Sequence, residues 1–192
     1  MKVVFSHGKE SGPWGSKIKA LAKVAKQLGC EVDSIDYRGI ESPDERVQKI
    51  SDYLQNEAKA INKTSESQPF ILVGSSMGGY VSLVCAQQYQ VKAHSNNQKL
   101  QGLFLLAPAL YMPNYNIQTY SGITNTEIVH GWSDDIIPVE HSIKYARQAL
   151  CTLHLIDGDH RLNSSLNQVI SLFTDFLQDV IQAEQNGIKA IG

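Results

Sequence analysis

Residues 70–79 read Phe70-Ile71-Leu72-Val73-Gly74-Ser75-Ser76-Met77-Gly78-Gly79. The first four are apolar, as in a strand covered on both faces, and a helical pattern follows from Met77 to about Tyr89. Gly74 and Gly78 permit a sharp turn between the strand and the helix. That turn would force the Ser76 side chain to point outward. The helix N-terminus also leaves the Met77 N–H free to stabilise an oxyanion. This strand, turn and helix predict a nucleophilic serine; a glycine-rich turn without catalysis is the alternative.

The rest of the chain repeats this alternation of short apolar runs and longer helical patterns. We expect strands over residues 3–6, 31–36, 70–74, 103–107, 126–130 and 152–156. We expect helices over 16–28, 43–61, 77–89 and 138–150, and a last helix from Asn163 or Ser164 onward; Ser16 and Ser42 should cap the first two. Polar residues 62–68 and 94–101 are interpreted as surface loops. The pattern predicts one α/β domain over residues 1–192, a three-layer sandwich with a mostly parallel six-stranded sheet.

Composition excludes several function classes. Seventeen basic and nineteen acidic residues give a net charge of −2, which favours neither nucleic acid nor an anionic membrane surface as a partner. No apolar run is long enough to cross a bilayer, and the N-terminus does not resemble a signal peptide, so we expect a cytoplasmic protein.

Cys30, Cys85 and Cys151 lack metal-type spacing and should be reduced thiols. We expect no metal and no nucleotide or other cofactor, because the motifs that would hold them are missing.

A nucleophilic serine needs a base and an acid that orients the base. The loop after the strand at 126–130 carries two acids, Asp134 and Asp135, and the loop after the strand at 152–156 carries one histidine, His160. Their order along the chain, serine, acid and then histidine, is typical of one class of catalytic triad. Either acid could serve at this point; a second role for Asp135 is to cap the helix before Pro138.

Four segments, taken together, resemble the α/β-hydrolase serine hydrolases, in particular their small lidless bacterial esterases. They are Ser6-His7-Gly8, residues 74–78, His130-Gly131-x-x-Asp134 with Pro138, and Gly158-Asp159-His160. The resemblance implies that Ser76 is the nucleophile, His160 the base and Asp134 the orienting acid. It also implies an oxyanion hole formed by the backbone N–H groups of Met77 and Lys9. The chain departs from larger members because the two leading strands and a long cap insertion are missing.

Residues 108–125 are the candidate for a rudimentary cap. Tyr111, Met112 and Tyr115 are candidate substrate contacts there, and packing of the loop onto the domain is an equal alternative. Outside this segment, His7 and His130 should bond loop backbone, His141 and His154 should be structural or exposed, and Asp157 and Asp159 should shape their loop.

The sequence therefore predicts a serine hydrolase that cleaves short-chain esters or thioesters of small molecules through an acyl-enzyme. A peptidase or amidase is the rival within enzymology, since the same triad serves both reactions. A non-catalytic interaction protein on a vestigial hydrolase fold is the rival from another class.

Overall fold

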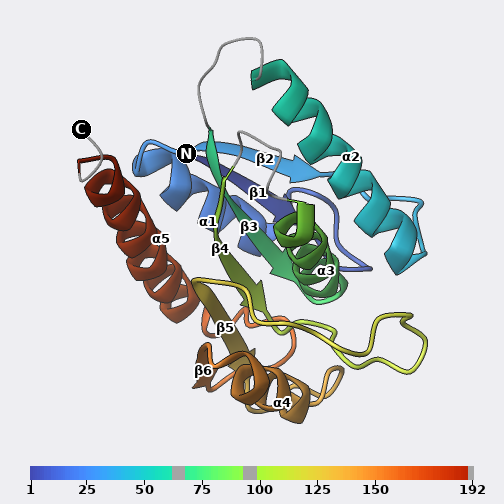
Figure 1. Cartoon of the computed structure of the whole chain (residues 1–192). Helices are drawn as coiled ribbons and strands as arrows, with labels where there is room; N and C mark the ends of the chain where they lie inside the picture. The colour runs from blue at the N-terminus through green and yellow to red at the C-terminus, as the bar shows by residue number, and fades with distance from the viewer. Residues whose placement is uncertain (62–67, 93–98, 190–192) are drawn as a thin grey trace.

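The computed structural model describes residues 1–61, 68–92 and 99–189. A parallel sheet of six strands lies at its centre, in the order β2-β1-β3-β4-β5-β6 (Figure 1). The strands are β1 (Lys2–Ser6), β2 (Glu31–Ile35), β3 (Pro69–Ser75), β4 (Lys99–Leu106), β5 (Thr126–Gly131) and β6 (Thr152–Ile156). The helices are α1 (Ser16–Gln27), α2 (Pro43–Ile61), α3 (Met77–Lys92), α4 (Val139–Ala149) and α5 (Leu166–Lys189). The predicted fold class is confirmed.

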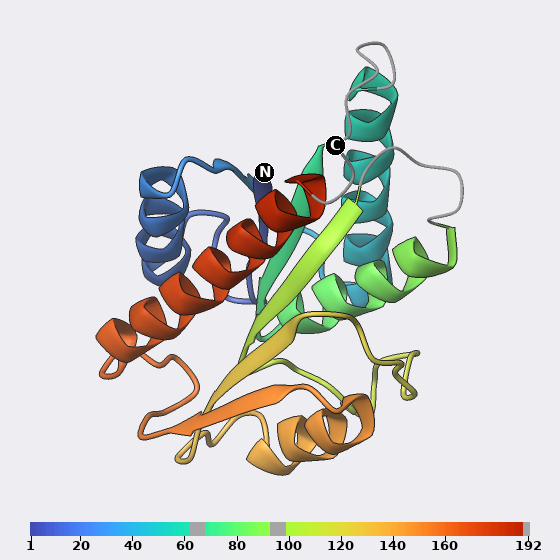
Figure 2. The same ribbon diagram turned by 60° about the vertical axis from the view of Figure 1, so that its left-hand side comes forward.

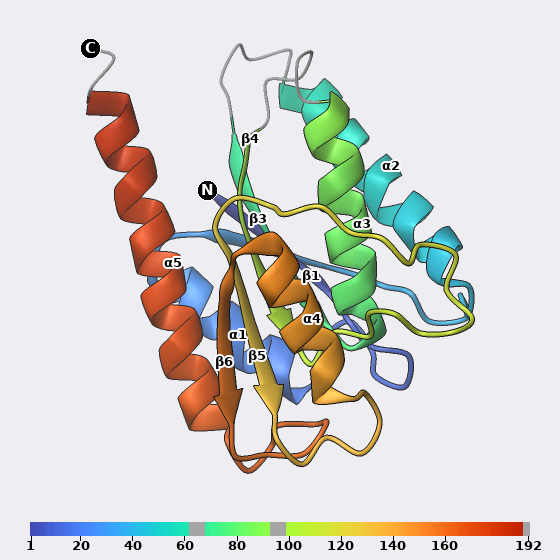
Figure 3. The ribbon, with the colours of Figure 1, turned by 60° about the horizontal axis from the view of Figure 1, so that its bottom comes forward.

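The helices form two outer layers. Helices α1 and α5 cover one face of the sheet, and α2, α3 and α4 cover the other (Figures 2 and 3). Side chains along β3 alternate between the two cores, with Leu72 in the α3 layer and Ile71 and Val73 in the α1 layer. This period of two explains why the strand sequence is apolar throughout, since both of its faces are buried.

Several predicted boundaries were wrong. Residues 99–101 belong to β4 and not to a loop, because pairing with β3 extends the strand into a polar stretch. The other parts of the predicted loops, 62–67 and 94–98, lie outside the described residues. Helix α3 continues to Lys92, and α5 begins at Leu166. Gly15 stands at the N-cap of α1, so Ser16 is its first residue and not its cap.

The predicted cap of α2 is confirmed. The hydroxyl of Ser42 accepts the N–H of Glu45 at 3.3 Å and so caps α2. All three cysteines are free thiols; Cys30 and Cys85 are buried and Cys151 is half-buried. No helix within the described residues has the length and apolar character of a membrane span.

Residues 107–125 connect β4 to β5 without any helix or strand. The segment passes between α3 and α4 (Figures 1 and 3), where the Tyr120 ring packs against the rings of Tyr80 in α3 and Tyr145 in α4. Because it contains no helix or strand, the segment forms no cap domain.

Candidate active site

Ser76 occupies a strained turn between β3 and α3. Its φ is 57°, in the left-handed region that non-glycine residues rarely adopt. The Ser76 N–H donates to the carbonyl of Leu106 at 2.9 Å, and its own carbonyl accepts from Gly79 and Ala109 at 2.9 and 3.0 Å. These bonds to the neighbouring strand, loop and helix hold the turn in its strained conformation.

The turn is possible only because glycines flank Ser76. A Cβ atom at Gly74 would lie 2.3 Å from the carbonyl oxygen of Gly78, and one at Gly78 would lie 2.1 Å from the carbonyl oxygen of Ser6. Both obstacles are backbone atoms, which cannot rotate away as a side chain could. The sequence prediction that these two glycines permit the sharp turn is confirmed.

Three loops bring Ser76, His160 and Asp134 into one hydrogen-bonded series. His160 Nε2 lies 3.0 Å from the Ser76 hydroxyl oxygen, and His160 Nδ1 lies 2.7 Å from Asp134 Oδ2. The residues follow β3, β6 and β5, whose carboxyl ends share one edge of the sheet. The Asp134 side chain is fully buried, and 18% of the His160 side chain is exposed. Chemically, the arrangement can pass a proton from the hydroxyl to the imidazole and stabilise the resulting cation.

Asp134 is held as a carboxylate by donors on both of its oxygens. Oδ1 accepts the N–H groups of Ile136 and Ile137 at 2.9 and 2.8 Å, and Oδ2 faces His160. Burial opposes ionisation, but the backbone N–H groups and the imidazole outweigh it, so the pKa of Asp134 lies below its ordinary value. The carboxylate is therefore charged and fixed in direction at neutral pH.

A second histidine contacts the same carboxylate. His130 is completely buried, and its Nε2 lies 3.0 Å from Asp134 Oδ2 and 3.1 Å from the carbonyl oxygen of Ile137. Its Nδ1 lies 2.7 Å from the hydroxyl of Ser142. Burial lowers the pKa of His130 below its ordinary value, which favours the neutral ring. The backbone contact of His130 was predicted from the sequence, and its contact with Asp134 was not. No local pattern indicates this contact, because a spacing of four residues brings side chains together on a helix and not across the end of a strand.

Asp135 does not have the role expected of it. It is exposed, and α4 begins after Pro138 without any side-chain cap. Asp134 instead accepts the two backbone N–H groups of this turn. The predicted cap at Asp135 was therefore wrong, because its neighbour already supplies the acceptor.

The remaining polar residues singled out in the sequence have structural contacts. His154 Nε2 lies 2.7 Å from Glu127 Oε2 on the adjacent strand, and His141 is half-buried beside the ring of Tyr111. Asp159 shapes its loop, since its carboxylate accepts the N–H of Leu162 at 2.8 Å. The Asp157 carbonyl accepts a hydrogen bond from Ser165. Within the described residues, no group of three or more His, Cys, Asp and Glu side chains could hold a metal ion.

The loop after β1 passes directly beside Ser76. A Cβ atom at Gly8 would lie 3.3 Å from the Cβ of Ser76. The N–H of Lys9 follows Gly8, and the N–H of Met77 opens α3 on the other side of the serine. Neither N–H donates a hydrogen bond to another residue in the described part of the chain. The Lys9 side chain points to solvent, where it pairs with Glu41 at 3.2 Å.

The aromatic residues of 108–125 pack onto the body of the protein. The Tyr115 ring lies 4.5 Å from that of Tyr80, and the Tyr111 ring meets that of Tyr120 edge-on at 5.1 Å. Met112 is half-buried, and its carbonyl accepts the Tyr115 N–H at 3.0 Å. These contacts favour the packing alternative for the two tyrosine rings.

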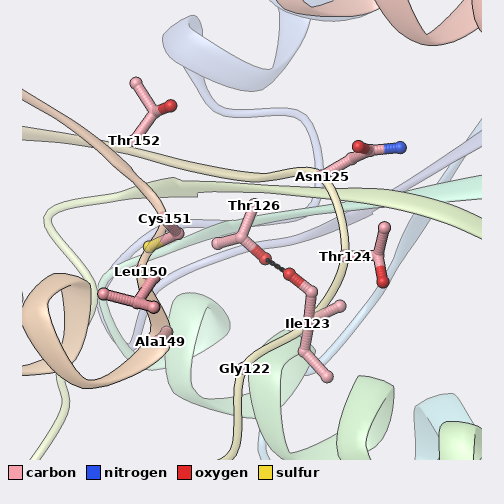
Figure 4. Close-up of a pocket in the computed structure, with 9 residues that line it drawn as sticks. All are labelled: Gly122, Ile123, Thr124, Asn125, Thr126, Ala149, Leu150, Cys151 and Thr152. Carbon is pink, nitrogen blue, oxygen red and sulfur yellow. Dashed lines mark hydrogen bonds between the residues drawn. The ribbon is translucent and has the colours of Figure 1, made fainter.

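A surface depression of about 430 Å³ lies away from these residues (Figure 4). Residues 122–126 and 149–152 line it, at the amino ends of β5 and β6. Ser76, Asp134 and His160 lie at the carboxyl ends of the parallel strands. The depression is therefore separate from the candidate active site.

Comparison with known proteins gives one family. The model of the family described as "Serine aminopeptidase, S33" matches residues 1–143, which include Ser76 and Asp134 and end before His160. No curated protein matches the chain.

Solved structures show the same fold. A candidate hydrolase of the alpha/beta superfamily from Xanthomonas campestris pv. campestris is 27% identical, with a TM-score of 0.72 over 93% of this chain and 98% of that chain. Est1E from Butyrivibrio proteoclasticus is 16% identical, with a TM-score of 0.73 over 94% and 88% of the two chains. An alpha/beta serine hydrolase without a lid, also from Xanthomonas campestris, is 16% identical, with a TM-score of 0.68 over 93% and 81%.

Proposed function

The chain belongs to the serine aminopeptidase S33 family of α/β hydrolases, and on this premise we propose that it cleaves short-chain carboxylic esters or thioesters through an acyl-enzyme. The observation that carries the proposal is the continuous series from the Ser76 hydroxyl through the His160 imidazole to the Asp134 carboxylate, with contacts of 3.0 and 2.7 Å. A serine hydroxyl becomes a useful nucleophile only with such a positioned base.

The first half of the proposed reaction acylates the enzyme. His160 Nε2 takes the Ser76 proton while the serine oxygen attacks the substrate carbonyl carbon, which becomes tetrahedral. The carbonyl oxygen becomes an oxyanion, to which the N–H groups of Met77 and Lys9 donate. Asp134 stabilises the imidazolium and keeps the Nδ1 proton in place. The imidazolium then protonates the departing alcohol or thiol, which leaves an acylated Ser76.

The second half returns the enzyme to its starting state. Water loses a proton to His160 and attacks the acyl carbon, giving a second tetrahedral intermediate in the same oxyanion hole. Its collapse releases the carboxylic acid and returns the proton to Ser76. The two halves consume one ester and one water, and they need no oxidant or reductant.

The fold supports a preference for esters with short acyl chains. Residues 107–125 form no helix or strand, and their aromatic rings pack onto the domain, so little material is left to enclose a long acyl chain. An acyl group gains up to about 0.8 kcal/mol for each methylene only while it finds apolar surface to cover. A shallow site therefore favours esters with about two to six acyl carbons.

An aminopeptidase activity is the second candidate, because the family model that matches carries that description. The two candidates use the same triad and differ in the leaving group. Amide cleavage additionally requires protonation of an amine and a site for the substrate's free α-amino group.

A substrate series separates these candidates. We expect kcat/KM on aryl esters to peak at about two to six acyl carbons and aminoacyl anilides to react much more slowly. Activity that keeps rising through long acyl chains would overturn the short-ester proposal, and turnover of anilides alone would establish the peptidase. Absence of any turnover that depends on Ser76 would favour an interaction protein on this fold.

A further inference from the structure

Arg46 is a buried arginine next to the candidate active site. It lies in the first turn of α2, and only 1% of the residue is exposed. Its Nε–H donates to the carbonyl of Ile40 at 2.7 Å. Its Nη1 donates to the carbonyls of Gly8 and His7 at 3.2 and 3.4 Å. The guanidinium carbon lies 5.3 Å from the centre of the Tyr37 ring.

The charge of Arg46 has no acidic partner at ion-pair distance within the described residues. Its burial lowers the pKa of Arg46, which reflects the cost of removing the cation from water. A buried cation that meets only neutral carbonyl groups has no opposite charge to offset the cost of its desolvation. The carbonyl groups that Arg46 holds therefore indicate a role beyond the stability of the fold.

One of these carbonyls belongs to the peptide unit that carries the Lys9 N–H. A peptide unit is planar, and in its trans form the carbonyl and the N–H point in opposite directions. The structure has no cis peptide bond among the described residues. The direction of the Gly8 carbonyl consequently fixes the direction of the Lys9 N–H.

His7 holds the same carbonyl from a second side. The N–H of Tyr37 donates to His7 Nε2 at 2.8 Å, so Nε2 is an acceptor and the ring proton sits on Nδ1. Nδ1–H then donates to the Gly8 carbonyl at 2.7 Å. Two donors, one neutral and one cationic, thus hold the carbonyl oxygen of Gly8, a residue that lies beside Ser76.

We propose that Arg46 is a positioning residue for the oxyanion hole: with His7, it orients the Gly8–Lys9 peptide so that the Lys9 N–H faces the oxyanion that forms at Ser76. The inference rests on the proposed function, in which this N–H is one of two donors. A hydrogen bond from a cation to the carbonyl also polarises the peptide unit and strengthens its N–H as a donor.

Arg46→Met is the informative variant because it keeps the side-chain volume and removes the donors and the charge. Loss of a whole oxyanion donor costs about 10²- to 10³-fold in kcat. Because His7 remains in place, we expect a smaller fall in kcat, about 10- to 100-fold. KM should stay within about twofold of the value for the unmodified protein, since the oxyanion interaction is made only in the transition state. Affinity for an alkylboronic acid, which adds to Ser76 as a tetrahedral adduct, should fall by the same factor as kcat/KM.

Arg38→Met is the matched control. It removes the same charge from the loop before α2, and the Arg38 side chain is 71% exposed. We expect its kcat, KM and boronate affinity to equal those of the unmodified protein. Thermal unfolding of both variants, together with rescue of Arg46→Ala by added guanidinium, separates positioning from a loss of folded protein.

The inference fails if folded Arg46→Met has an unchanged kcat, or if its KM rises while kcat and boronate affinity stay the same. If the unmodified protein neither turns over esters nor reacts with the boronic acid, the proposed function fails instead. A crystal structure of Arg46→Met then decides the matter: a reoriented Gly8–Lys9 peptide supports the positioning role, and an unchanged one overturns it.

Discussion

Substitution of Asp134 by asparagine should disable the site while leaving its shape intact. Oδ1 accepts two backbone N–H groups, from Ile136 and Ile137, so the asparagine oxygen must take that position. The amide NH₂ then takes the place of Oδ2, where it faces Nδ1 of His160 and Nε2 of His130; the His130 ring still has the carbonyl oxygen of Ile137 as a partner. If the amide turned over, the two backbone N–H groups would face another donor. Each unsatisfied group would then cost about 1 to 3 kcal/mol of free energy.

The amide forces His160 into the wrong tautomer. Nδ1 must become an acceptor, so the ring proton moves to Nε2, which can no longer take the proton of Ser76. We expect kcat/KM to fall about 10³- to 10⁴-fold, which corresponds to about 4 to 5.5 kcal/mol in the transition state.

The assay is the initial rate on a short-chain aryl ester, with thermal unfolding to confirm that the variant is folded. Asp135→Asn is the matched control, since it changes the same charge at an exposed neighbour, and it should keep nearly full activity. If folded Asp134→Asn keeps a kcat/KM within tenfold of the unmodified protein, or if Asp135→Asn loses more activity, Asp134 is not the acid that orients His160.

Three further predictions follow from the same geometry. Ser76→Ala and His160→Ala should each lower kcat by about 10³-fold or more, and the double variant should be little worse, because the two residues act as one unit; steady-state kinetics of all three checks this. In the folded protein, burial lowers the pKa of His130, whereas in the unfolded chain the same imidazole takes up a proton near pH 6.5. As the pH is lowered from 6.5, the free energy of unfolding should therefore decrease, by up to about 1.4 kcal/mol per pH unit. Urea unfolding at pH 7 and pH 5 should show a smaller fall in His130→Asn. Gly78→Ala should lower the free energy of unfolding by about 3 kcal/mol or more, because the new Cβ would lie 2.1 Å from the Ser6 carbonyl oxygen. Gly187→Ala has open space around it in α5 and should raise the free energy of unfolding by about 0.5 to 1 kcal/mol in the same measurement.

The sequence predicted the scaffold well because its signals are local and periodic. The apolar run before Ser76 and the helical pattern after it identify a strand, a turn and a helix without any tertiary information. The proline and serine at the start of α2 likewise mark a helix N-terminus. Where pairing with a neighbour decides the structure, as at the polar start of β4, the local signal failed.

The surroundings of the site were less predictable because they depend on which way side chains point. Asp134 and Asp135 differ by one position in a loop, and only the folded turn shows which of them is buried and which is exposed. Arg46 carries no motif, and in the sequence it is one charged residue of an amphipathic helix. Its contact with the Gly8 carbonyl spans 38 positions and arises from the packing of α2 beside the loop after β1.

Labelling with a fluorophosphonate tests whether Ser76 is an activated nucleophile, because such a reagent forms a covalent bond with an activated serine. Mass spectrometry of the digested protein should find the phosphonyl group on Ser76, at one group per chain. Labelling should be lost in Ser76→Ala and strongly slowed in His160→Ala. A folded protein that stays unlabelled, or one that carries the group on another serine such as Ser75, would show that Ser76 is not the nucleophile.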